Sequence, residues 1–204
     1  MGRYSSDSGS GNFTPAPIGT HVARCFRIVD IGTHKGEYQG KPTRRNQVII
    51  AWELPDELIE TDEGDKPIVT SRFYTNSLGE KANLRHDLET WRGRAFTREE
   101  LDRFDLETIV GTPCLITIVG GENGKTKVNA VSGLPKGTKC APQVNESFTF
   151  WLDDFDPDKF DLLSEGIQKL IKQSEEYLQI KNGGPVDTSG DRDVNDDLEE
   201  EIPF

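Results

Sequence analysis

The chain has 204 residues and a formal net charge of −12, with 33% of its residues hydrophobic and 29% charged. This length suits one domain with appendages, and the polar composition predicts that part of the chain stays unfolded. Neither a run of about 18 apolar residues nor an apolar signal core near Met1 is present, which argues against membrane insertion and export. We therefore expect a cytoplasmic protein with no membrane partner.

The first part of the chain predicts a flexible lead and then three strands. Residues 1–12 are predicted to be flexible because Ser, Gly and Asp dominate them and bury little apolar surface. Three stretches have the alternation or the β-branched residues of strands. The stretch between the first two strands, 32–42, is rich in glycine and is predicted to be a loop. The predicted strands are 18–31, 48–54 and 68–74.

The periodicity then changes to that of a helix. Ser77 to Glu80 has the spacing of a capping box, and Leu84, Leu88 and Trp91 fall on one helical face. A helix is therefore predicted from about residue 80 to residue 91. The second capping signal, at Thr97 to Glu100, predicts a short helix after it.

Two further strands complete a β-rich domain. Residues 114–119 and 125–131 have strand patterns, and an Asn-Gly pair typical of hairpins lies between them. Five strands with a helical insert between the third and the fourth give the order of an oligonucleotide-binding (OB) barrel. The predicted fold class is thus mainly β with helical additions, with an OB-like five-stranded barrel over residues 13–152.

A helix and an acidic tail are predicted after the barrel. Residues 148–152 can add an edge strand, and apolar spacings after Asp156-Pro157 predict one long helix within 153–181. Its apolar stripe packs either on the barrel or on another subunit, so a homo-oligomer stays open. The Gly-Gly-Pro sequence that follows ends ordered structure, and 182–204 is predicted to be a disordered acidic tail.

The negative charge is concentrated in this tail. Between residues 183 and 204 there are eight acidic side chains and one arginine, a net of −7, so residues 1–182 carry −5 of the total. Residues 18–54 have a local excess of +3. A basic face on an acidic molecule is therefore permitted, and nucleic-acid binding requires such a face.

The last three residues, Ile202-Pro203-Phe204, differ from the acidic run before them. A solvated tail accounts for the acids, but an apolar triplet in water is unfavourable unless a partner binds it. Pro203 limits the entropy lost on docking, Phe204 offers a ring for a pocket, and the acids attract a basic partner surface. The predicted partner-binding tip consists of Asp196, Asp197, Glu199, Glu200, Glu201, Ile202, Pro203 and Phe204.

Residues Glu199 to Phe204 resemble the ends of bacterial single-stranded-DNA-binding proteins, in which a run of acids precedes Ile-Pro-Phe. The resemblance covers only the tail, and this chain has Glu where those proteins mostly have Asp. It implies that the tip recruits replication, recombination and repair proteins in a bacterial cytosol. The segment from Leu88 to Thr97 is similar to one in phage-encoded proteins of this role, so host and phage origins both stay open.

The first three strands also carry a candidate surface for single-stranded DNA. Binding that tolerates any sequence needs flat rings for base stacking and cations along the phosphates. Strand alternation sends about half of the side chains inward, so the core is the alternative for each ring, and a plain solvated loop or hairpin is the alternative for the lysines. Arg72 shares a face with Tyr74, which makes Tyr74 rather than Phe73 the predicted platform. The candidate DNA-binding residues are Arg24, Phe26, Arg27, Lys35, Tyr38, Lys41, Arg44, Arg45, Trp52, Arg72, Tyr74, Lys125 and Lys127.

No pattern indicates catalysis. His21, His34 and His86 lack metal-ligand spacing, the three cysteines are widely and irregularly spaced, and no phosphate-binding glycine loop is present. We therefore expect no enzymatic activity, metal or cofactor. The main alternative to a DNA-binding module is an adaptor or decoy protein that displays the tip without binding DNA, and a metal-dependent nuclease is a more distant one.

Overall fold

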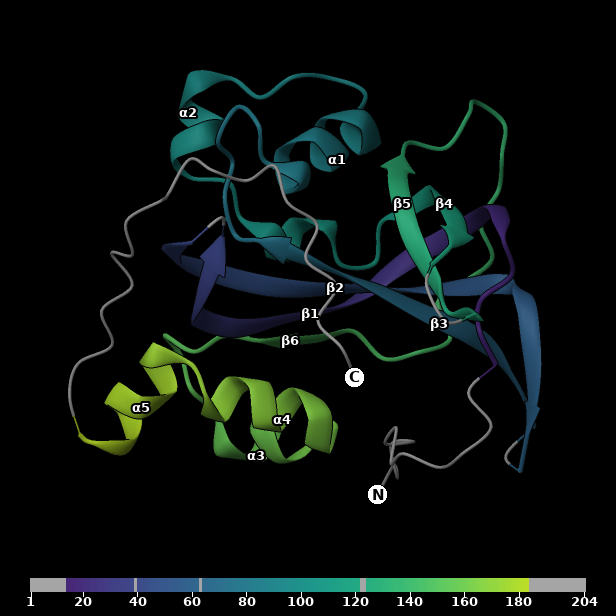
Figure 1. Ribbon diagram of the computed structural model, residues 1–204. Coiled ribbons are helices and arrows are strands. Elements are labelled where there is room, and N and C mark those ends of the chain that lie inside the picture. Colours follow the sequence, from purple (N-terminus) through teal and green to yellow (C-terminus); the bar gives the residue numbers. More distant parts are fainter. Residues whose placement is uncertain (1–13, 39, 63, 122–123, 184–204) are drawn as a thin grey trace.

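The protein is described by a computed structural model over residues 14–38, 40–62, 64–121 and 124–183. A six-stranded, mainly antiparallel sheet that does not close lies at its centre, which confirms the mainly β prediction (Figure 1). The strand order is β3-β2-β1-β4-β5, and β6 pairs with β1 in parallel. The strands are β1 (Gly19–Tyr38), β2 (Lys41–Thr61), β3 (Gly64–Thr75), β4 (Pro113–Gly120), β5 (Thr126–Ser132) and β6 (Phe148–Phe150).

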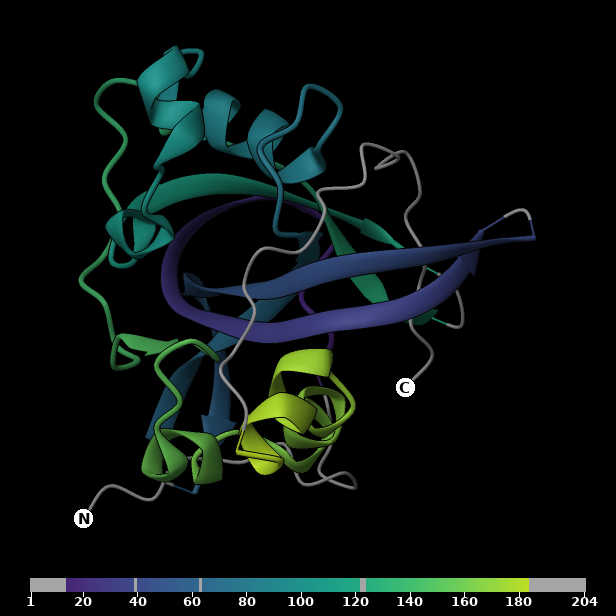
Figure 2. The same cartoon turned by 90° about the vertical axis from the view of Figure 1, so that its left-hand side faces the viewer.

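The first two strands are longer than the sequence predicts and form one continuous hairpin. Residues of the predicted loop pair across it, as Lys35 does with Arg44. Gly32 has a φ of +79°, a conformation that glycine adopts without a steric penalty, and it lies at a shift in the strand register. The glycine therefore marks a bulge inside β1 rather than its end. Figure 2 shows the hairpin extending past the rest of the sheet.

One hydrophobic core lies between the sheet and the helical insert. β2 contributes Trp52, and α1 buries Leu84, Leu88 and Trp91 against it. The ring centroids of Trp52 and Trp91 are 6.3 Å apart. The insert between β3 and β4 is present as predicted, and it consists of α1 (Asn83–Arg92), α2 (Arg98–Asp102) and the 3-10 helix η1 (Leu106–Ile109).

The two predicted capping boxes differ in outcome. At α2 the prediction is confirmed, because the Thr97 side chain accepts from the Glu100 N–H and the Glu100 side chain accepts from the Thr97 N–H. At α1 it is wrong. The Ser77 hydroxyl accepts from the N–H of Gly79 at 3.1 Å within a turn, and the helix begins only after Ala82, which offers no side-chain cap.

A second core lies on the opposite side of the sheet, beneath three C-terminal helices (Figure 1). The prediction of one long helix is wrong, because Ser164 and Ser174 each accept a hydrogen bond from the following turn and start a new helix. Packing on the chain's own sheet is confirmed, with Phe160, Leu163 and Ile171 buried against β1, β2 and β6. The helices are α3 (Pro157–Asp161), α4 (Glu165–Lys172) and α5 (Glu175–Lys181).

Both predicted flexible ends fall outside what can be described. The lead 1–12 and the tail from residue 184 onward, including the tip, lie beyond the described residues, and only Asn182 and Gly183 of the predicted tail follow α5. Within the described ranges, none of the helices combines the length and the apolar character that a membrane crossing requires.

Candidate nucleic-acid interface

Three of the four rings among the candidate DNA-binding residues are buried. Trp52 is 0% exposed, and Tyr74 and Phe26 are each 3% exposed. The alternation argument for Tyr74 fails because both faces of the central strands are covered. Tyr74 faces the core under α1, and Phe73 packs against the second core under the C-terminal helices. Trp52 and Tyr74 are therefore core residues rather than DNA platforms.

Arg72 belongs to a polar cluster that we call the Arg72 seam, which consists of Arg72, Tyr74, Asp87 and the backbone carbonyl of Asn129. Its guanidinium donates to the Asp87 carboxylate at 2.9 Å and to the Asn129 carbonyl at 3.0 Å, which links β3 to α1 and β5. The Tyr74 hydroxyl donates to the same carboxylate at 2.7 Å. Burial, with the Asp87 charge beside it, raises the pKa of Tyr74 well above its usual value. Arg72 therefore ties the two ends of the sheet together and has a structural role, while its predicted DNA contact stays a prediction.

Arg24 and Glu53 hold the segment between β5 and β6 against the sheet. Arg24 donates to the carbonyls of Gly111 at 2.6 Å and Ala141 at 2.9 Å. The fully buried Glu53 carboxylate accepts from the backbone N–H groups of Val144 at 2.9 Å and Asn145 at 2.8 Å. These contacts give Arg24 a structural role, while its predicted DNA contact stays a prediction. An acidic residue in a strand gave no sequence signal for such a role.

Four predicted cations gather at the end of the β1–β2 hairpin, which we call the basic hairpin. Lys35 has a side chain 79% exposed, and Lys41 is also exposed. The hairpin touches the C-terminal helices through Glu175 of α5, whose carboxylate lies 3.4 Å from Lys35 Nζ and 2.7 Å from an Arg44 Nη. The side chain of Tyr38 lies outside the described residues. The basic hairpin comprises Lys35, Lys41, Arg44 and Arg45.

The neighbouring residue Glu176 fixes α5 to the base of this hairpin. Its buried carboxylate accepts from the Thr33 N–H at 2.6 Å and from the Thr33 hydroxyl at 2.5 Å. A Cβ added to Gly32 would lie 2.5 Å from the Cβ of Ser174, so this close approach of helix and strand requires glycine. The position of the basic hairpin is therefore coupled to α5, a contact that the sequence did not predict.

Arg27 lies on the face of the sheet that carries the second core, beside the part that the C-terminal helices cover. The register of β1 shifts between Cys25 and Arg27, and Arg27 then pairs with Ala51 on β2 and with Phe148 on β6. Its guanidinium carbon lies 5.4 Å from the ring centroids of both Phe26 and Phe148. Burial lowers the pKa of Arg27. Phe26 thus supports a cation instead of stacking on DNA as predicted.

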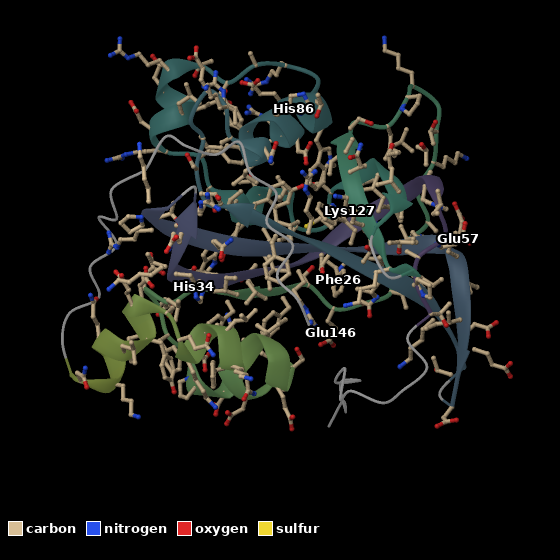
Figure 3. The ribbon with its side chains drawn as sticks, in the orientation of Figure 1. Phe26, His34, Glu57, His86, Lys127 and Glu146 are labelled. Atoms are coloured by element: carbon tan, nitrogen blue, oxygen red, sulfur yellow. The ribbon has the colours of Figure 1, made fainter. Side chains whose placement is uncertain are left out.

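These residues line a small cavity that we call the Arg27 pocket. Its volume is about 60 Å³. Figure 3 labels two of its residues, Phe26 and Glu146, on the side of the sheet nearest α3 and α4. The pocket is lined by Phe26, Arg27, Asn145, Glu146, Ser147, Phe148 and Leu162.

The last two predicted cations lie on another hairpin. Lys125 is exposed and Lys127 is half-buried on β5, both with neighbours in the fold. Figure 1 shows the β4–β5 turn and the end of the basic hairpin at opposite sides of the molecule. The structure thus brings together the four cations of the basic hairpin, but it does not bring Lys125 and Lys127 to them.

Among the described residues, no group of three or more His, Cys, Asp or Glu side chains is arranged to hold a metal ion. Burial raises the pKa of the Cys25 thiol to about 12 and that of Cys114 well above its usual value, which disfavours their thiolate forms. A comparison of the chain with protein-family models and with curated proteins finds no match.

Proposed function

We propose that this chain is a non-enzymatic module of the cytosol that binds single-stranded DNA without sequence preference through an OB-type barrel. The support is the strand order, with the helical insert between β3 and β4, and the Arg72 seam that brings β3 beside β5. In an OB barrel the loop between the first two strands borders the binding face. Here that position is taken by the basic hairpin.

The basic hairpin is the observation that carries the proposal. It concentrates four cations on an otherwise acidic chain, and it extends past the rest of the sheet (Figure 2). Cations on an extended hairpin can follow a flexible phosphate backbone at low cost in desolvation. Lys125 and Lys127 provide a second and smaller contact in this proposal, at the β4–β5 hairpin.

We also propose that the tip from Glu199 to Phe204 recruits replication, recombination and repair proteins. The support comes from the sequence, because an apolar triplet after a run of acids suits a basic pocket with an apolar floor. The tip and the DNA-binding surface are then separate parts of one chain.

The decisive experiment is a fluorescence titration with a poly-pyrimidine single strand and with a duplex of equal length, at two salt concentrations. We expect tighter binding to the single strand, weakened by salt. Lys35→Glu with Lys41→Glu should reduce the affinity strongly. The matched control is Lys159→Glu with Lys169→Glu, which reverses two exposed lysines on the C-terminal helices. Equal loss in both double variants would show that only total charge matters.

A second function is favoured by the burial of Trp52, Tyr74 and Phe26, which removes three of the four predicted stacking rings. In this alternative the chain is an adaptor or decoy that presents the tip and binds no DNA. The same titration separates the two functions, because the adaptor shows no saturable binding to the single strand at low salt.

A further inference from the structure

Arg27 has surroundings unlike those of Arg24 and Arg72. Arg24 donates to two carbonyls, although its own Nε is also buried without a partner among the described residues, and Arg72 donates to a carboxylate. The guanidinium of Arg27 instead lies against the rings of Phe26 and Phe148, and its Nε is buried without a hydrogen-bond partner among the described residues. A buried, charged donor without an acceptor is unfavourable, and the same guanidinium belongs to a residue that lines a pocket, where an anion can accept from its other nitrogens.

The pocket beside this guanidinium has the volume and a hydroxyl donor that an anion site needs. Its volume of about 60 Å³ is several times what one ordered water needs. Ser147 lines it, and the Ser147 hydroxyl oxygen already accepts from Gln143 Nε2 at 3.0 Å. The hydroxyl proton of Ser147 is therefore available for a second acceptor.

Part of the rim of the pocket is apolar. Leu162 of the segment between α3 and α4 is 46% exposed, and the ring of Phe148 is half-buried. An aromatic base can lie against such a surface whatever its identity, because every base has the same kind of flat face. A phosphate site next to an apolar rim matches the two halves of a nucleotide.

We propose that the Arg27 pocket is a subsite for one nucleotide of a single strand. Arg27 and Ser147 donate to the oxygens of a phosphodiester, and the attached base lies against Leu162 and Phe148. This inference rests on the proposed function and adds the position at which the strand is anchored. Phosphate is the ligand because its several oxygens fit the planar donor fork of a guanidinium.

Glu146 allows a second test, in which the expected change in DNA affinity is opposite to that of Arg27→Gln. Glu146 lines the same pocket, and it has an interaction of its own. A negative charge beside a bound phosphate weakens binding. Glu146→Gln is therefore expected to raise the affinity for a single strand, while Arg27→Gln lowers it.

The test measures the affinity of the full chain for a thymidine oligonucleotide by fluorescence anisotropy across a range of salt concentrations. Arg27→Gln is compared with Arg98→Gln, which changes an exposed arginine on α2. We expect Arg27→Gln to weaken binding about tenfold or more, and to reduce the salt slope by about 0.7 for the lost phosphate contact. Its stability to urea should stay equal or rise, because the change removes a buried charge with an unmet donor.

Four results would overturn the subsite, and each has a distinct meaning. Unchanged affinity and slope in Arg27→Gln, with wild-type binding intact, reject the subsite alone. A loss of stability that accounts for the loss of binding makes Arg27 structural. Absence of single-strand binding by the wild type rejects the proposed function together with the subsite. A shift of the Arg27 Nε NMR signal by inorganic phosphate, without strand binding, makes the pocket a general anion site.

Discussion

Arg72 and Arg27 lie on strands that flank β2, and their surroundings are opposite. Arg72 is enclosed by the seam under α1, where the Asp87 carboxylate and the Asn129 carbonyl accept its hydrogen bonds. Arg27 lies on the face that carries the second core, between two rings, with its Nε unmet among the described residues. One arginine has its hydrogen bonds accepted within the fold, whereas the other lines a pocket and has part of its hydrogen-bonding capacity unused among the described residues.

The difference shows why a strand arginine cannot be assigned to a ligand by its strand alone. A guanidinium that meets a buried acid becomes part of the fold, because its removal leaves that acid unpaired. A guanidinium held by rings keeps its position without using its in-plane donors. The acceptors supplied by distant parts of the chain therefore decide whether an arginine is structural or available for binding.

The largest expected effect concerns Arg72, whose guanidinium is paired with the Asp87 carboxylate. Asp87→Ala removes the acceptor shared by Arg72 and Tyr74, and it leaves a buried cation and a buried hydroxyl without that partner. Breaking a buried ion pair in this way costs about 3–5 kcal/mol. Urea unfolding should show this loss. Asp102→Ala, at an exposed position of α2, is the control and should change stability by less than about 0.5 kcal/mol.

The comparison fails if the two sites respond alike. Arg27→Gln, measured under the same conditions, should not reproduce the loss seen in Asp87→Ala. A loss of similar size in Arg27→Gln would mean that the two rings depend on the cation as strongly as the seam depends on its ion pair.

The second prediction extends the comparison to a buried acid. Asp30 accepts from the N–H groups of Gly32 at 2.8 Å and Leu152 at 3.3 Å. Burial, with the charges of Glu176 and Asp153 adding to it, raises the pKa of Asp30 from 3.8 to about 6. The folded state thus binds this proton more tightly than the unfolded state does, so the stability that it contributes is present below pH 3.8 and is lost as the pH rises through about 6.

The measurement is the pH dependence of unfolding rather than stability at one pH. Relative to Asp30→Asn, the wild type should lose about 2–3 kcal/mol of unfolding free energy between these two pKa values. The amide cannot titrate, so its curve should be flatter over this range. Parallel curves would show that folding does not raise the pKa of Asp30.

The third prediction concerns the tip, which should act without disturbing either arginine site. Phe204→Ala should weaken capture of partner proteins from a bacterial lysate by about 2 kcal/mol or more, as expected for a buried aromatic anchor. Val186→Ala, elsewhere in the tail, is the control. Deleting Glu199 to Phe204 should leave DNA affinity unchanged or higher, because tethered acids compete with phosphates for cations. Reduced DNA affinity after deletion would place the tip in the DNA-binding surface.

Local patterns predicted much of the fold. Strand alternation, the Asn-Gly hairpin and the Thr97 capping box each depend on neighbouring residues, and the structure has all five predicted strands and the insert in the predicted order. The predicted loop and the predicted long helix were wrong for a shared reason. Gly32 and Ser174 have more than one local use, and the packing of α5 against β1 selects a bulge for one and a helix cap for the other.

The candidate site was harder to predict because it depends on contacts far apart in the sequence. The grouping of cations on the β1–β2 hairpin follows from their neighbourhood in the chain. The other contacts join distant segments. Asp87 pairs with Arg72, Phe148 lies against Arg27, and Glu176 holds α5 to the base of the basic hairpin. No local sequence pattern predicts these contacts. Both faces of the sheet are covered, so the usual inference that one of two adjacent aromatics is exposed does not hold here.

The smallest expected effect concerns Glu175, which gives the basic hairpin an acidic partner of a kind that Arg27 does not have among the described residues. Its carboxylate lies 3.4 Å from Lys35 Nζ and 2.7 Å from an Arg44 Nη. Glu175→Gln should remove the negative charge beside both cations and raise single-strand affinity about two- to fivefold at low salt, because partly exposed ion pairs are worth at most about 1 kcal/mol. The gain should shrink as salt screens these charges. Glu165→Gln at the exposed start of α4 is the control. A lower affinity in Glu175→Gln would mean that the acid orients Lys35 and Arg44 for the strand instead of competing with it.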